Sequence, residues 1–429
     1  MNTTAIALLL GSFAFLTIIK IPITFALGIS SVITAYYLNI PAAMIAQSLV
    51  RGINSFSLLS IPFFILAGEI ISQGGISIQL IKFADVLVGR VRGGLAMVNV
   101  LDSTFFGGIS GSTVADISSL GSIMIPMMEQ KGYDKDYSVA ITVATAAQAV
   151  LIPPSHNMII YSLAAGGVSV GRLFLGGIIP GLTLAAALLI YTYVVAVKRD
   201  YPAEEPVPFK EAIIIIKDAL LGVFTAVIIL GGVISGIFTA TESAAIAVVY
   251  AFIITFFVYK VPIKVFGKIL TDSLNTLAVV LALIACSNAF GWMLAYLRVP
   301  VYATEVLLSI SSNKYVILLI INLLLLLLGM IMDMAPLIMI TTPILLPVVT
   351  AVGIDPVHFG IIMVLNLAIG LMTPPVGSAL FVACAIGKIS VEELTKALIP
   401  FYIVMIAVLL LITYIPSLTM FLPDLLMGS

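Results

Sequence analysis

The chain has 429 residues, of which 62% are apolar and only 9% are charged, and its formal net charge is −1. In a soluble domain about a quarter of the residues are charged. This composition therefore excludes an ordinary water-soluble fold and predicts that lipid surrounds most of the chain. The near-neutral charge offers no basic surface for nucleic acid. The two cysteines lie far apart and match neither a disulfide framework nor a metal site.

Apolar runs long enough to cross a bilayer as a helix recur along the whole chain. They predict an all-α polytopic membrane protein. The uninterrupted runs cover residues 3–19, 21–38, 54–73, 173–197, 218–236, 242–259, 276–297 and 397–419.

Two further stretches, residues 94–128 and 315–348, are too long for one crossing and too short for two, which need roughly 40 residues plus a turn. Their mid-points, FGGISGST and MDMAPL, are weakly polar. This combination predicts a re-entrant helical hairpin in each stretch. Two longer apolar runs, residues 137–165 and 357–385, carry Pro-Pro near their centres and predict broken helices, because proline removes a backbone donor.

A shift of 221 positions aligns the two halves of the sequence: Pro126 meets Pro347, and the two Pro-Pro pairs meet each other. Each half then contains five crossings, an odd number, so the second half is expected to lie upside down in the membrane. Inverted repeats with broken helices are typical of secondary transporters. The predicted parts are a first repeat over residues 1–198, a cytoplasmic connector over 199–217 and a second repeat over 218–429.

The positive charges give an orientation. With both hairpins re-entrant, the positive-inside rule places the 19 Lys and Arg residues in the cytoplasm, except for Arg51, Arg172, Arg298 and Lys314. Both termini are then expected on the periplasmic side.

The hairpin tips and helix breaks are candidate cation sites, because backbone groups freed there find no partner in hydrocarbon. The first tip, residues 110–113, offers hydroxyls and carbonyls, and the first break, residues 152–155, offers carbonyls. Such oxygen ligands suit a hard cation such as sodium. Asp333 and Thr373 stand at the corresponding places of the second half, which predicts two cation sites related by symmetry. The alternative is that the prolines form packed kinks only.

Other polar residues give further candidates. A charged side chain at membrane depth is costly unless it is paired or coordinated. Asp116 follows the first tip and is expected to line either the solute site or a further cation site, whereas Asp102 is expected to bond to hairpin backbone. Ser155 and Asn157, beside the first break, are the expected solute contacts. No Lys or Arg lies near either tip in the sequence, so an organic anion would have no buried cationic partner.

Three stretches of the sequence are distinctive: the run GGLAMVNVLDSTFFGGISGSTVADISSLGSIMIPMMEQKGYDKDYSVAITVATAAQAVLIPPS, GGIIPG at 176–181 and TPPVG at 373–377. Together they resemble the large membrane subunit of tripartite ATP-independent periplasmic (TRAP) transporters. The likeness covers nearly the whole chain. It implies a sodium-driven elevator importer of the bacterial inner membrane, with two or more coupled sodium ions and an organic acid such as sialic acid or a C4-dicarboxylate as solute. The sodium ligands that the resemblance implies are Ser110, Ser112, Ala149, Ile152, Pro154, Asp333, Thr373 and Val376.

The resemblance also implies two protein partners, a periplasmic substrate-binding protein and a small four-helix membrane subunit. The alternative function is a channel for ions or solutes. A channel needs a continuous polar pore, whereas the polar residues here gather near two tips. No paired carboxylates, HExxH sequence, Ser/His constellation or GxxxxGK[ST] loop stands in the sequence, so neither an enzyme nor an ATP-driven pump is expected.

Overall fold

The computed structural model describes residues 2–428, except for the side chains of residues 56, 57, 109 and 110. Its regular structure within this range is entirely helical, which confirms the predicted all-α class. Six of the described helices are long and apolar enough to cross a membrane, or seven if α4 (Ser60–Gln73) and α5 (Ile76–Val88), which meet at a bend of 70°, are counted as one span.

The first half begins with α1 (Thr3–Ile18) and α2 (Ile23–Tyr37), close to the predicted runs. The predicted run 54–73 is only the second part of a longer helical segment. This segment consists of α3 (Ala42–Ile53), the 3-10 turn η1 (Phe56–Leu59) and α4.

Both predicted hairpin stretches form two helices joined by a short turn. The first consists of α6 (Gly94–Ser110) and α7 (Thr113–Gln130), with Gly111 at φ +59°, a left-handed conformation that glycine adopts without steric cost. The second consists of α15 (Lys314–Gly329) and α16 (Met334–Ala351).

Both predicted broken helices are interrupted at Pro-Pro. In the first, α8 (Lys135–Ala146) and the 3-10 turn η2 (Gln148–Val150) are separated from α9 (His156–Ala164). In the second, α17 (Pro356–Leu371) is separated from α18 (Ser378–Gly387).

The other helices show three differences from the predicted runs. Residues 209–217, predicted as connector, already belong to a helix, because no Gly or Pro follows Pro208 there to stop it. The run predicted over 276–297 begins twelve residues earlier, and that over 397–419 ends before Pro416. These helices are α10 (Val170–Lys198), α11 (Phe209–Ile234), α12 (Ala240–Ile253) with the π-turn η3 (Ile254–Val258), α13 (Lys264–Tyr296), α14 (Val299–Ile310), α19 (Val391–Tyr414) and α20 (Ser417–Met427).

Helix bounds in the two halves follow the shift seen in the sequence. Helices α7 and α16 are 221 residues apart at both ends. The same shift lays the α3–α4 segment on α13, and α5 on α14, to within a few residues. These matches support the proposed repeat, while its inversion in the membrane stays a prediction.

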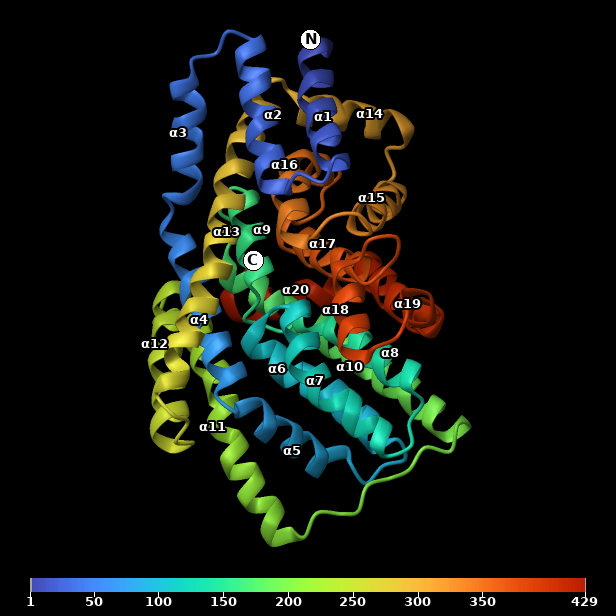
Figure 1. Cartoon of the computed structure of the whole chain (residues 1–429). Coiled ribbons are helices and arrows are strands. Elements are labelled where there is room, and N and C mark those ends of the chain that lie inside the picture. Colours follow the sequence, from blue (N-terminus) through green and yellow to red (C-terminus); the bar gives the residue numbers. More distant parts are fainter. Residues whose placement is uncertain (1, 429) are drawn as a thin grey trace.

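The helices form two groups, for which we use two names. The scaffold column consists of α3, α4 and α13, and Figure 1 shows α13 running beside the other two. The inner body consists of the two hairpins and the two broken helices, α6–α9 and α15–α18, grouped beside this column in Figure 1. The largest cluster of buried apolar side chains lies mainly in the inner body and the helices around it.

Each hairpin lies unusually close to the broken helix of its own half. A Cβ added to Gly107 would lie 2.5 Å from the Cα of Ala149, and one added to Gly329 would lie 3.0 Å from the Cα of Gly370. Polar bonds reinforce both contacts. In the first half, the Asn99 amide donates to the Thr142 hydroxyl at 2.7 Å. In the second, the Asn366 amide donates to the Asn322 side-chain carbonyl at 2.8 Å.

One aromatic side chain joins the two halves. The hydroxyl of Tyr161 in α9 donates to the Pro356 carbonyl at 2.6 Å. Its ring lies where a side chain at Gly360 would stand, because a Cβ there would be 2.4 Å from the ring. The two broken helices are therefore packed against each other.

The close contact between hairpin and broken helix gives a stability prediction. We expect Gly107→Ala to destabilise the protein by about 1–3 kcal/mol, because the added methyl overpacks a contact that leaves no room for it. The measurement is thermal unfolding in detergent.

Gly231→Ala in α11 is the matched control, since a Cβ there meets no atom within 4 Å. It should be neutral or stabilise by roughly 0.5–1 kcal/mol, because alanine favours a helix over glycine. Equal stability of the two variants would contradict the close packing of the first hairpin.

Candidate functional site

The first tip lies directly on the first break. A Cβ at Gly111 would be 2.7 Å from the carbonyl oxygen of Pro154. The next residue, Ser112, caps α7: its hydroxyl accepts from the backbone N–H of Ala115 at 3.4 Å. Hydroxyl and carbonyl oxygens, which suit a small cation, thus lie beside the N-terminus of α7. A helix N-terminus favours an anion bound next to it.

The second tip and second break meet in the same way. The carbonyl of Met330 accepts from the backbone N–H groups of Val376 and Gly377, at 3.1 and 3.2 Å. Asp333 caps α16 by accepting from the Met334 N–H at 2.8 Å, which leaves its second oxygen for another ligand. The Thr373 hydroxyl donates to the carbonyl of Ile369 at 2.7 Å, so its lone pairs remain available as acceptors.

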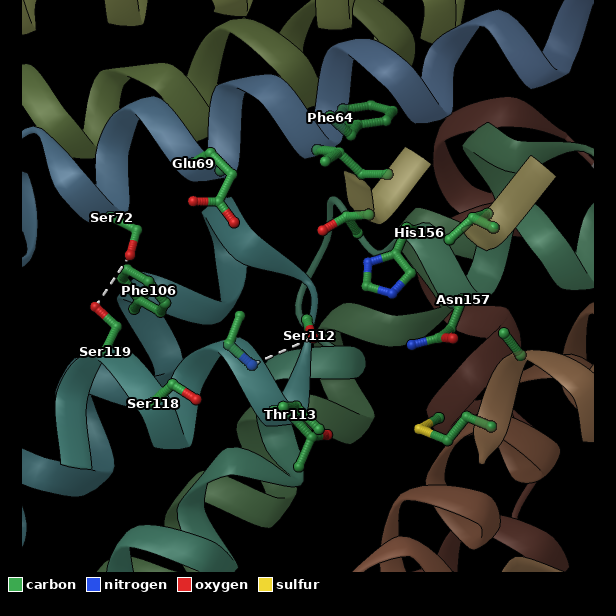
Figure 2. Close-up of a pocket in the computed structure, with 18 of the residues that line it drawn as sticks. Phe64, Glu69, Ser72, Phe106, Ser112, Thr113, Ser118, Ser119, His156 and Asn157 are labelled. Atoms are coloured by element: carbon green, nitrogen blue, oxygen red, sulfur yellow. Dashed lines mark hydrogen bonds between the residues drawn. The ribbon is translucent and has the colours of Figure 1, made fainter. Parts of the chain in front are cut away.

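A cavity of about 860 Å³, here called the central cavity, lies between these elements and the scaffold column. Figure 2 shows Glu69 of α4, Ser112 of the first tip, and His156 and Asn157 of the first break around this space. Asp333 brings the second tip into the same lining. Both tips and the first break therefore line one cavity, although Ser112 and Asp333 are more than 200 residues apart in sequence.

The scaffold column contributes polar side chains that sequence reasoning missed. The Gln73 amide bridges two carboxylates, donating to Glu69 at 2.9 Å and to Asp272 of α13 at 3.0 Å. Lys268, one turn before Asp272, lines the central cavity. The folded chain thus places one basic residue in the lining of the same cavity as the two tips. The sequence does contain a signal for this polar face of α13, because polar residues recur there every four positions, at Lys268, Asp272 and Thr276.

One polar contact crosses from the scaffold column to the first hairpin. Ser72 of α4 donates to Ser119 of α7 at 3.2 Å, drawn as a dashed line in Figure 2. Ser118 and Ser122 of α7 also line the cavity, so this wall is rich in hydroxyls.

The predicted solute contacts divide into two sets. Asn157 lines the central cavity, together with its neighbour His156. Asp116 and Ser155 are fully buried and do not belong to its lining, because they point into the packed interior of the inner body.

The predicted cation ligands lie around both tip-and-break contacts. Ser112 and Asp333 line the cavity, whereas Ala149, Ile152, Pro154, Thr373 and Val376 do not. The side chain of Ser110 lies outside the described part of the structure, although its backbone ends α6.

Two buried carboxylates stand behind the first tip. Asp116 accepts from the Ser103 hydroxyl at 2.8 Å through one oxygen, and its other oxygen has no hydrogen-bond partner among the described residues. Both oxygens of Asp102 lack such a partner as well, so the expected bonds to hairpin backbone are not formed. Buried carboxylates without donors call for a proton or a cation as their charge partner.

The donor set suits hard monovalent cations better than transition metals. It consists of carbonyls, hydroxyls and single carboxylates, and the described residues contain no group of three or more His, Cys, Asp or Glu that could hold a metal ion. The arrangement thus offers oxygen ligands of the kind that hard cations prefer, beside a polar space large enough for an organic molecule.

Comparison with known proteins agrees with this arrangement. Residues 10–418 match the family described as tripartite ATP-independent periplasmic transporter, DctM component. The chain is 40% identical to the sialic acid TRAP transporter large permease protein SiaM of Vibrio cholerae, over 89% of this chain and 90% of that protein. It is 35% identical to the C4-dicarboxylate TRAP transporter large permease protein DctM of Rhodobacter capsulatus, over 98% and 99% of the two chains.

The fold also resembles that of a solved transporter. The structure of the Alcanivorax borkumensis YdaH transporter superposes with a TM-score of 0.64, covering 87% of this chain and 88% of that one, at 16% sequence identity. At this identity the likeness concerns the fold alone. With a family match over nearly its whole length and large permease relatives aligned from end to end, the chain belongs to the DctM family of TRAP transporter large permeases, which are membrane transport proteins rather than enzymes.

Proposed function

We propose that this chain imports an organic acid across the bacterial inner membrane by sodium-coupled secondary transport, with the inner body moving as an elevator against the scaffold column. The observation that carries the proposal is the convergence of Ser112, Asn157 and Asp333 on one cavity at the boundary between these two groups of helices. A solute bound there would touch the inner body on one side and the scaffold on the other.

Sodium is the proposed coupling ion, bound at two or more sites. The first site would use Ser110, Ser112 and the carbonyls of residues 149–154, where the tip rests on the break. The second would use Asp333, Thr373 and carbonyls near Val376. Sodium at these places would offset the negative charge of the tips and bring positive charge next to the solute carboxylate.

The solute is proposed to be a small organic acid. The named relatives transport sialic acid and C4-dicarboxylates, two acids of different size that share a carboxylate. The central cavity, with Lys268, hydroxyls and the N-termini of α7 and α16 in its walls, suits a carboxylate of either kind.

A carrier fits the geometry better than the alternative of a channel. The central cavity and a second cavity beside α13 share no lining residue, whereas a channel needs one continuous polar path.

The partners are proposed from the family. A periplasmic substrate-binding protein would deliver the acid, and a small four-helix membrane subunit would widen the scaffold against which the inner body moves. The chain itself would lie in the membrane with both termini in the periplasm and the connector in the cytoplasm.

Orientation is tested with a reporter that is active only in the cytoplasm. Inserted near Pro206, in the connector between α10 and α11, the reporter should be active, and fused to the C-terminus it should be silent. An active C-terminal fusion would show that the number of crossings is not the one proposed.

The role of Asp333 is tested by separating its charge from its helix cap. Asp333→Asn keeps an N-capping side chain but removes the negative charge. We expect the sodium concentration for half-maximal uptake to rise about tenfold or more, because sodium loses a charged ligand. The measurement is uptake into proteoliposomes over a sodium series.

The matched control is Asp355→Asn, since Asp355 caps α17 by accepting from Val357 at 2.7 Å and does not line the cavity. Its sodium dependence should equal that of the wild type. If both variants behave alike, Asp333 acts as a helix cap only.

The tripartite arrangement is tested by leaving out one component at a time. Proteoliposomes with an inward sodium gradient should take up N-acetylneuraminate or succinate only when the binding protein, the small subunit and this chain are all present. Comparable uptake of free acid by this chain alone would refute the need for partners.

A further inference from the structure

A second cavity, of about 530 Å³ and here called the outer cavity, lies along the half of α13 farther from Lys268. Its volume falls in the range of roughly 300–1,000 Å³ that small-molecule sites occupy. Four segments line it: the end of α3 with the turn that follows, the end of α9 with its glycine turn, the second half of α13, and α16. It therefore lies at the boundary between the scaffold column and the inner body, as the central cavity does.

The charge of the outer cavity has one sign. Among the described residues that line it, Arg51 is the only charged one. Within the described chain, Arg51 forms none of the ion pairs, and its guanidinium makes no hydrogen bond. The central cavity, by contrast, combines Lys268 with the carboxylates of Glu69 and Asp333. The outer cavity therefore favours an anion, whereas the central cavity holds charges of both signs.

A buried hydroxyl in the same lining also lacks a partner. Ser287 is 2% exposed, and its oxygen forms no hydrogen bond with any described residue. A buried hydroxyl without a partner is unfavourable, so a ligand that accepts from it gains this interaction. Its neighbour Asn288 packs closely against Gly52, where an added Cβ would lie 2.6 Å from the Asn288 Cβ.

The two cavities are consecutive along one helix. Val280 is the last α13 residue in the lining of the central cavity, and Ile284 is the first in that of the outer cavity. Four residues of helix span about 6 Å, so a molecule in one cavity lies a short step from the other.

We propose that the outer cavity is a second binding site for the transported organic acid, in which Arg51 binds the carboxylate while Ser287 and Asn288 donate hydrogen bonds. This inference rests on the proposed transport of an organic acid. A guanidinium matches a carboxylate with two parallel N–H···O bonds, which lysine cannot provide. The solute would occupy this site farther along α13, at the same boundary between the scaffold column and the inner body as the central cavity.

The first test fills the outer cavity and uses a control on the same helix. A Cβ at Gly291 or at Gly267 of α13 meets no atom within 4 Å, and only Gly291 lines the outer cavity. In the complete reconstituted complex, Gly291→Leu should lower sodium-driven uptake of N-acetylneuraminate or succinate about tenfold or more. Gly267→Leu should transport like the wild type.

The second test measures occupancy without transport. Ser55→Cys, in a chain with Cys286 and Cys384 replaced by alanine, places a thiol in the lining that a maleimide can label. The transported acid should slow this labelling. Arg51→Met should raise the protecting concentration about tenfold, Arg51→Lys should raise it less, and Lys314→Met, which removes a charge outside the cavity, should leave it unchanged.

The outcomes separate this inference from the proposed function. If the wild-type complex transports an acid but that acid never protects the thiol, the second site does not exist, and any effect of Gly291→Leu reflects space needed for movement. If protection occurs but is equal with and without Arg51, the assignment of Arg51 is wrong. Failure of the wild-type complex to transport either acid would overturn both proposals.

Discussion

The rest of this structure depends on how the chain satisfies backbone groups where helices stop inside hydrocarbon. A helix that ends in lipid leaves amides and carbonyls without partners, at a cost of several kcal/mol each. The chain meets this cost by placing each hairpin tip on the break of its own half. In the second half, the Met330 carbonyl accepts from two N–H groups of the break. In the first, Gly111 lets the tip approach the carbonyl of Pro154.

This pairing brings backbone close to backbone within the inner body. Glycine contacts such as Gly107 on Ala149, with buried amide and hydroxyl bonds beside them, hold the inner body together. The first hairpin also packs on the scaffold column. Ile70 and Ile71 of α4 share a buried apolar cluster with Phe106 of α6, and Ser72 of α4 donates to Ser119 of α7 at 3.2 Å. The boundary between the two groups of helices therefore combines apolar packing with polar contacts beside the central cavity.

Hairpins and breaks could be predicted from sequence because their signals are local. Length fixes how many times an apolar run can cross, and Pro-Pro or Gly-Ser at mid-length fixes where it stops. Short helices such as α3, α5 and α14 carry no such signal, since their 12 or 13 residues do not span a bilayer.

The site was only half predictable for a related reason. Tips and breaks indicated Ser112, Asn157 and Asp333, which do meet in the central cavity. Lys268, on the scaffold side of the same cavity, stands far from either tip in sequence, and only the packing of α13 places it in the lining. Asp116 was expected to line either the solute site or a further cation site, and it is fully buried outside the cavity lining.

The seam between the halves, where Tyr161 rests on α17, has a consequence for how the sequence can change. The ring takes the space of any side chain at position 360, and its hydroxyl is bound to the carbonyl of Pro356. A larger residue at 360 is therefore tolerated only if the ring at 161 becomes smaller in the same step. Two positions in opposite halves of the chain are thus tied to each other, and we expect substitutions at this seam to occur in matched pairs.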